Sequence, residues 1–410
     1  MAHHHPVKLD AETVGNFNDL GEAPERTALI VGVIAIAASA FLSAFSAVNW
    51  QHFLFTYLVN FCYVLTFSLG AFFFISVQFV IRVGWSVVVR RIMEVVSLGA
   101  LPCVILFLPL LAVVWSGYTG MWPWNDPAVV EADHLVGRRG GWMNPTMFTL
   151  RAVFYFLVWV GMTRLIFKKS TCQDVTGDPK ITNQMEGWGA LCIFLFATTA
   201  TFASFDWIVS LDKVWFSTIF GVYFFAGCIV GFSSLTNLIV LILLKTGKLS
   251  PSVVTVEHRH NLSKIMFFST CFWGYNAFSQ YLLYWYANIP EETGWFLVRE
   301  KGGWGFLAYV LIFGHFAIPF LGMMSRAVKR NANLMIFWCC YMLVMHWLDL
   351  YWQIMPNMSP NFIPFGITEV LVLVGMVAFV FAGVMWQAGG TPLVAIKDPR
   401  LDESIAFHDI

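Results

Sequence analysis

The sequence predicts an all-α polytopic membrane protein with ten transmembrane helices. Three observations carry this prediction: hydrophobic residues make up 58% of the 410-residue chain, charged residues only 12%, and apolar stretches of spanning length recur along all of it. A soluble domain contains about 25% charged residues and could not cover its surface with so few. The balance of 24 basic against 24 acidic residues also excludes a basic nucleic-acid binder.

Ten stretches are long enough to cross a hydrocarbon core about 30 Å thick, which takes about 20 apolar residues. Each is expected to be α-helical, because backbone in lipid must satisfy its own hydrogen bonds and these runs are too long for barrel strands. The expected spans are 27–48, 53–81, 92–116, 146–167, 187–207, 215–244, 262–288, 304–325, 334–353 and 364–387. They divide the chain into an N-terminal tail, 1–26, a transmembrane domain, 27–387, and a C-terminal tail, 388–410.

The distribution of Lys and Arg predicts the orientation of these spans. Eighteen of the 24 basic residues fall in the tails and the even-numbered loops, and six fall on the other side. Cytoplasmic loops carry the excess of basic residues, so both tails are expected to be cytoplasmic. The N-terminal tail is acidic and lacks the pattern of a cleavable signal peptide, so the first span is expected to be retained.

No cofactor motif accompanies the spans. The eight cysteines form no C-x-x-C pair, so the chain offers no iron–sulfur or zinc ligand set and no c-type haem attachment. Neither a P-loop nor G-x-G-x-x-G occurs in the sequence. We therefore expect this chain to bind no metal and no cofactor of its own.

Titratable residues at membrane depth are the candidate functional residues, because a charge in lipid is costly unless it is paired or faces water. The ninth span carries His346 and Asp349 one turn apart, and the tenth places Glu369 about 8 Å below its outer end. Three such groups at similar depth in neighbouring helices predict a polar pocket or a proton relay.

Further polar residues on the other spans are weaker candidates. They are Glu94 in the third span, Arg151 in the fourth, Asp206 in the fifth, Asn276 and Gln280 in the seventh, and His315 in the eighth. Two structural interpretations stay open here. Glu94 could form an interfacial ion pair with the adjacent Arg90 and Arg91, and a single buried histidine such as His315 is often only a packing residue.

Two aspartates occupy comparable positions in the two halves of the chain. Asp206, in SFDW, and Asp349, in HWLD, each lie at the outer end of an outward-running span. If spans 2–5 and 6–9 form two four-helix bundles, both aspartates lie on the fourth helix, which fits a layout of parallel repeats. The long outer segment 117–145, which contains Trp122 and Trp124, is expected to form an aromatic belt at the membrane surface or a docking surface for a partner.

Two stretches carry a resemblance to a known family. Residues 143–159, MNPTMFTLRAVFYFLVW, and 204–227, SFDWIVSLDKVWFSTIFGVYFFAG, resemble the NrfD/polysulfide-reductase (PsrC) type of polytopic membrane subunit. Within it, the chain is most similar to the second such subunit of alternative complex III, a bacterial quinol:cytochrome c oxidoreductase. The ten-span layout with both ends inside agrees along essentially the whole chain.

The resemblance implies two four-helix bundles, helices 2–5 and 6–9, flanked by helices 1 and 10, in a bacterial cytoplasmic (inner) membrane. It implies a respiratory complex that oxidises menaquinol or ubiquinol, with haem c and iron–sulfur clusters in partner subunits. The implied partners are a second NrfD-like subunit, an iron–sulfur subunit, c-type cytochrome subunits and lipids, but no nucleic acid. This chain would scaffold the quinol-oxidising module and conduct protons, without being catalytic alone.

Two other functions remain open at the level of sequence. One is a haem b membrane anchor with His315 and His346 as axial ligands, since both lie within the membrane. The other is a secondary transporter, a class that favours helices broken by Gly or Pro near the middle of the membrane. Pro102, Pro109 and Pro319 interrupt spans here, but not at corresponding places in the two halves.

Overall fold

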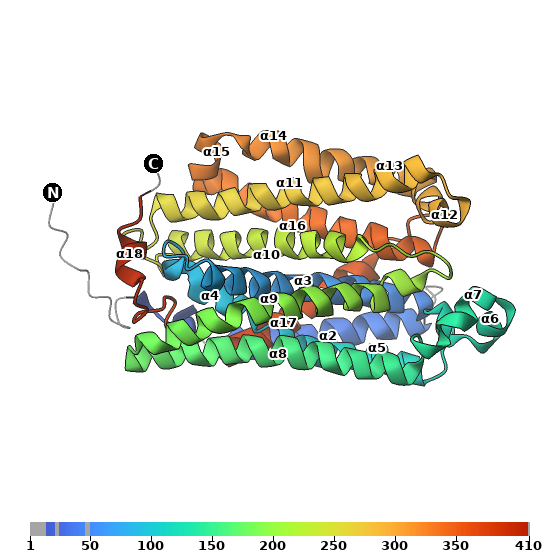
Figure 1. Ribbon diagram of the computed structural model, residues 1–410, viewed down its shortest axis with the longest axis horizontal. Coiled ribbons are helices and arrows are strands. Elements are labelled where there is room, and N and C mark those ends of the chain that lie inside the picture. Colours follow the sequence, from blue (N-terminus) through green and yellow to red (C-terminus); the bar gives the residue numbers. More distant parts are fainter. Residues whose placement is uncertain (1–13, 21–23, 46–49, 409–410) are drawn as a thin grey trace.

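The computed structural model describes residues 14–20, 24–45 and 50–408, so parts of the predicted N-terminal tail, 1–13 and 21–23, lie outside the described residues. Long α-helices run side by side along the longest axis of the molecule (Figure 1). The described residues contain no β-strand beyond a single bridge between Asn16 and Pro392. The predicted all-α fold is confirmed.

The main helices follow the expected spans. They are α2 (Pro24–Phe45), α3 (Trp50–Val80), α4 (Val87–Ser97), α5 (Ala100–Trp115), α8 (Pro145–Thr176), α9 (Pro179–Trp207), α10 (Phe220–Lys245), α11 (Val256–Ala287), α13 (Gly302–Val310), α14 (Ile318–Met324), α16 (Ala332–Ile354) and α17 (Ile367–Ala388). The short helices are η1 (Phe17–Leu20), η2 (Pro123–Asn125), α6 (Pro127–Ala132), α7 (His134–Arg138), η3 (Arg139–Gly141), η4 (Val209–Leu211), α12 (Pro290–Arg299), α15 (Arg326–Arg330), η6 (Met355–Asn357) and α18 (Leu401–Ile405). A π-helical segment, η5 (Leu311–Ala317), joins α13 to α14.

Nine helical segments of the described chain are long and apolar enough to cross a membrane. The seventh expected span, 262–288, corresponds to α11, which has 32 residues but is not one of these nine. Buried polar side chains, among them Asn276 and Gln280, interrupt its apolar sequence. A multi-pass membrane protein is thus supported, and the count of ten spans stays a prediction.

Two expected spans are not single regular α-helices, and a proline accompanies each departure. The third begins at Val87 rather than 92 and breaks at Leu98 and Gly99 between α4 and α5. Pro102 follows the break, and it has no N–H for the carbonyl four residues earlier. The eighth span widens into η5 just before Pro319, which likewise leaves the carbonyl of His315 without its usual partner.

The helices form two groups that meet along α3. The first bundle consists of α3, α4 with α5, α8 and α9, and the second of α10, α11, α13 to α14, and α16. Helix α3 also packs against α10 and α16, and a Cβ on Gly70 would lie 2.2 Å from the carbonyl oxygen of Cys228. Helices α2 and α17 pack together, and α17 also contacts α3 and α5. We call the end with α6, α7 and α12 the distal end and the end with α18 the terminal end (Figure 1).

The segment 117–145 folds over the distal end of the first bundle. Trp122 and Trp124 are buried there, and their indole N–H groups donate to the carbonyl of Trp207, at 3.4 Å, and to Oγ of Ser210, at 3.3 Å. These two side chains therefore form neither a surface belt nor a docking surface. They fasten the segment to the end of α9.

Candidate functional site

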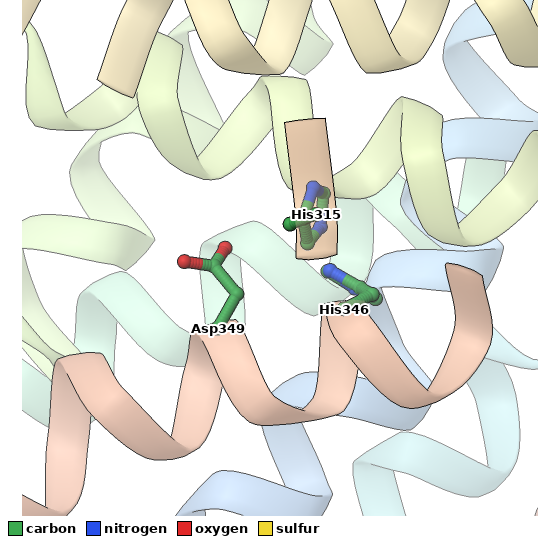
Figure 2. Close-up of side chains that lie close together, drawn as sticks. All are labelled: His315, His346 and Asp349. Carbon is green, nitrogen blue, oxygen red and sulfur yellow. The ribbon is translucent and has the colours of Figure 1, made fainter. Parts of the chain in front are cut away.

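Three titratable side chains meet inside the second bundle. His315 comes from η5, and His346 and Asp349 come from α16. The nearest ligand atoms of the three side chains lie within 4.8 Å of one another, and none of the three residues is more than 1% exposed (Figure 2). We call these three residues the central cluster.

Local helix geometry brings the central cluster together. His346 and Asp349 are three residues apart, so both lie on one face of α16, and His315 approaches from the opposite segment (Figure 2). The π-helical turns of η5 shift the register of the chain where His315 lies. Such single-segment π-bulges occur frequently at functional sites.

Asp349 is held by neutral donors. The Tyr223 hydroxyl donates to Oδ1 at 2.5 Å, and the Trp273 indole N–H donates to Oδ2 at 3.0 Å. Among the described residues, no Lys or Arg forms an ion pair with this carboxylate. A buried charge without an opposite charge nearby is costly, and the two donated hydrogen bonds offset part of that cost for this carboxylate.

The Thr66 hydroxyl is the hydrogen-bond partner of His346. Its oxygen lies 2.6 Å from the carbonyl oxygen of Tyr63 and 2.9 Å from Nε2 of His346. When the hydroxyl donates to the carbonyl, Nε2–H is the donor to Thr66 and Nδ1 carries the lone pair. In the described structure, Nδ1 has no hydrogen-bond partner.

His315 is the least satisfied member of the central cluster. Its ring stacks on Trp273 with 3.8 Å between the ring centroids, and it is fully buried. Neither ring nitrogen has a hydrogen-bond partner among the described residues. Most buried polar groups are paired, and each exception calls for an explanation such as a proton, water or ligand role.

The packing around the two imidazoles bears on cofactor binding. A haem between His315 and His346 needs a flat slot, but Trp273 lies against His315, and Tyr63 lies against His346 with ring centroids 5.6 Å apart. This filled space argues against the haem b anchor. The three groups are close enough to share one small cation, but both oxygens of Asp349 already accept hydrogen bonds, and we assign no metal there.

Glu369 does not join the central cluster. Its Oε1 lies 2.5 Å from Nε2 of His52 and accepts from the Thr56 hydroxyl at 2.9 Å, and its Oε2 accepts from the backbone N–H of Gly366 at 2.8 Å. The carboxylate is fully buried between α17 and the distal end of α3. The single pocket expected from sequence is therefore two sites, and we call Glu369 with His52 the distal pair.

Asp206 and Arg151 form a closed ion pair in the first bundle. Arg151 donates from Nε to Oδ2 at 2.7 Å and from Nη2 to Oδ1 at 2.9 Å, and the Tyr155 hydroxyl adds a bond of 2.8 Å. The guanidinium also lies 4.3 Å from the ring centroid of Trp142. Both carboxylate oxygens of Asp206 therefore accept hydrogen bonds.

The two polar residues predicted on the seventh span have ordinary partners. Asn276 donates to the carbonyl of Phe272 in its own helix, at 2.8 Å. Gln280 donates to Oγ of Ser217 at 3.3 Å, close to the distal end. Both are buried on one face of α11, as their spacing predicts.

Glu94 belongs to an ionic network at the terminal end. Its carboxylate oxygens lie 3.1 Å from Nε of Arg90 and 3.2 Å from Nη1 of Arg91. Arg90 also binds Asp398 of the C-terminal segment at 2.5 Å, and Arg91 binds Asp174 at 2.5 Å. The ion-pair interpretation of Glu94 thus extends to a network that ties the C-terminal segment to the first bundle.

Sequence reasoning missed several residues of these sites. The donors Tyr223 and Trp273 come from α10 and α11, and no local pattern marks them as partners of Asp349. The spacing of His52, Thr56 and Asn60, four residues apart on one span, is a signal that could have been found.

Comparisons with known proteins do not identify the chain. No family model matches it, and no curated protein matches it either. The relation to NrfD-type subunits that residues 143–159 and 204–227 suggest stays a prediction.

Proposed function

We propose that this chain is an integral membrane subunit of a bacterial respiratory quinol-oxidising complex and that protons move through its second bundle. The observation that carries the proposal is the central cluster: a buried carboxylate without a countercharge beside imidazole nitrogens without partners. In this proposal the electrons pass through haem c and iron–sulfur clusters of partner subunits. The chain itself supplies scaffold and proton transfer.

Buried polar side chains between α10 and α11 support proton movement between the terminal end and the central cluster. Asn237 of α10 donates to Oγ of Ser263 of α11 at 3.4 Å, and further along the same two helices the hydroxyls of Ser233 and Ser269 lie 3.0 Å apart. All four side chains face the interior between α10 and α11. They provide hydrogen-bonding groups between the terminal end and the central cluster, where an apolar core would provide none.

The chemistry of quinol oxidation requires such groups. Two protons must leave as two electrons leave, and imidazole and carboxylate side chains are the usual acceptors. Nδ1 of His346 has no hydrogen-bond partner, and no Lys or Arg of the described residues pairs with Asp349, so neither group has to break an ion pair to exchange a proton. The arrangement supports reversible proton transfer better than it supports a purely structural role.

The proposal is tested with Asp349→Asn in the complex purified in mild detergent through this chain. We expect the variant to assemble with the same partner proteins but to lose about tenfold or more of quinol-coupled proton release after reconstitution into liposomes. Asn276→Leu is the matched control, because Asn276 is equally buried in the same bundle and binds only its own helix. Unchanged proton release in Asp349→Asn, or co-purification without any redox partner, would refute the proposal.

A further inference from the structure

Two sets of polar residues lead from the central cluster to the distal end. One set ends beside a basic side chain and the other ends beside an acidic side chain. The first set lies in the second bundle itself, where Gln353, Gln280 and Ser217 extend beyond Asp349. The second set leaves the bundle sideways and follows α3. Since a proton carries positive charge, the charge at the far end of each set decides which one it can follow.

The set within the second bundle finishes at a buried cation. Arg299 of α12 is 1% exposed, and its guanidinium donates to the backbone carbonyls of Trp295, Trp352 and Gln353 at 2.9, 3.2 and 2.7 Å. It forms no ion pair among the described residues. Arg299 borders a pocket of about 510 Å³ that Asp212 and Lys213 also line. A fixed positive charge beside a proton path is an electrostatic barrier to protons and cations.

The set along α3 lies on one face of that helix. His52, Thr56, Asn60, Tyr63 and Thr66 follow at intervals of four, four, three and three residues, and all are buried. We call these five residues the α3 row. In Figure 1, α3 runs between α10 of the second bundle and α2.

Contacts tie both ends of the α3 row to titratable groups. At its inner end, Oγ1 of Thr66 is hydrogen-bonded to Nε2 of His346 at 2.9 Å. Midway, the Trp347 indole N–H donates to Oδ1 of Asn60 at 2.8 Å. At its distal end, Thr56 and His52 both reach Oε1 of Glu369, at 2.9 and 2.5 Å.

The distal pair has the properties of a terminal proton acceptor. Glu369 is a fully buried carboxylate, and its ion-pair partner among the described residues is the imidazole of His52. The His52 side chain is 11% exposed, and its Nδ1 has no hydrogen-bond partner in the described structure. A proton that reaches Glu369 can therefore pass to His52, whose buried Nδ1 is the unpartnered nitrogen of the distal pair.

We propose that protons pass between the central cluster and the distal surface along the α3 row, with Glu369 and His52 as the terminal group, and that Arg299 closes the direct exit. The inference rests on the proposed function. Each step transfers only a proton: charge rests on His346 and on the distal pair, while the hydroxyl and amide groups between them orient water and do not ionise.

The test compares the two exits in the purified complex reconstituted into liposomes. Glu369→Gln removes the terminal acceptor and Thr56→Val removes a hydroxyl of the α3 row, whereas Gln280→Leu blocks only the exit inside the second bundle. We expect quinol-coupled proton release at the distal side to fall about tenfold in Glu369→Gln, to fall in Thr56→Val, and to stay unchanged in Gln280→Leu. Glu369→Asp should restore part of the loss.

The outcomes separate this inference from the proposed function. Loss in Asp349→Asn and in Gln280→Leu, with normal release in Glu369→Gln, would overturn the α3 exit and leave proton transfer through the bundle standing. Normal release in all variants would overturn both. A readout independent of folding is the difference infrared spectrum during turnover, where Glu369→Gln should remove a carboxyl band that Gln280→Leu retains; a band retained in both would overturn the role of Glu369.

Discussion

Asp206 in the first bundle and Asp349 in the second lie at equivalent places, near the distal end of the fourth helix of each bundle. Asp206 binds Arg151 through two hydrogen bonds, at 2.7 and 2.9 Å. Asp349 accepts from the neutral donors Tyr223 and Trp273, at 2.5 and 3.0 Å, and pairs with no Lys or Arg among the described residues. The two aspartates therefore share a position but have different electrostatic surroundings.

The difference shows that the countercharge decides what a buried carboxylate can do. Two unit charges about 4 Å apart attract by about 4 kcal/mol at an effective dielectric constant of about 20. Asp206 and Arg151 share an attraction of this order, so this ion pair fastens α9 to α8 and its role is structural. Among the described residues Asp349 has no such partner, which is why the proposed proton transfer is assigned to it and not to Asp206.

The largest expected effect comes from breaking the ion pair of the first bundle. Arg151→Met leaves Asp206 buried and unpaired, and removing one partner of such a pair typically costs about 3 kcal/mol or more in the free energy of unfolding. The double variant Arg151→Met/Asp206→Leu should recover most of that loss, because no isolated charge remains. Thermal unfolding of the detergent-purified protein measures both. A single variant as stable as the wild type would show that Asp206 needs no countercharge, and the comparison would fail.

A smaller effect is expected at Asp398, a paired carboxylate outside the spanning helices. Burial alone would raise the pKa of Asp398, but the guanidinium of Arg90, 2.5 Å away, holds this pKa below its ordinary value. A carboxyl group whose pKa is lowered by folding stabilises the protein above the pKa of the unfolded chain, about 4, and this stability is lost as the pH falls through the lower folded value.

The measurement at Asp398 is the dependence of unfolding on pH. Wild-type stability should decline as the pH falls below about 4, and Asp398→Asn should remove that part of the decline while lowering stability at neutral pH. This measurement tests at a second paired aspartate whether a basic partner stabilises the fold, as Arg151 is expected to do for Asp206. Identical pH profiles for the two proteins would mean that the contact with Arg90 does not stabilise the fold.

The sequence predicted the helices well because length and apolarity alone determine a span. It also predicted that His346 and Asp349 lie together, since residues three apart on one helix share a face whatever surrounds them. The partners of Asp206 and Asp349 could not be predicted, because they depend on the rotation and register of helices distant in sequence. The π-helical turns that bring His315 into the central cluster were unpredictable for the same reason.

Glu369 illustrates the limit most clearly. Glu369 lies in the first turn of α17, at the end of the helix where the sequence placed it, but that position does not determine the direction in which a side chain points. Helix α17 packs against α2, α3 and α5, so its inward face meets His52 and Thr56 rather than the second bundle. Three groups at similar depth were therefore assigned to one pocket when they belong to two.

The smallest expected effect comes from replacing one ring beside each aspartate. The expected change in the free energy of unfolding has opposite signs in the two bundles. Tyr155→Phe removes a satisfied hydrogen bond to Asp206 and should lower the free energy of unfolding by about 1 kcal/mol. His315→Phe keeps the ring stacked on Trp273 but removes two buried nitrogens without partners, so it should raise that free energy by up to about 1 kcal/mol while reducing proton transfer. Chemical or thermal unfolding of both variants measures the contrast. A destabilised His315→Phe variant would assign His315 to packing, because only a functional group is retained at the expense of stability.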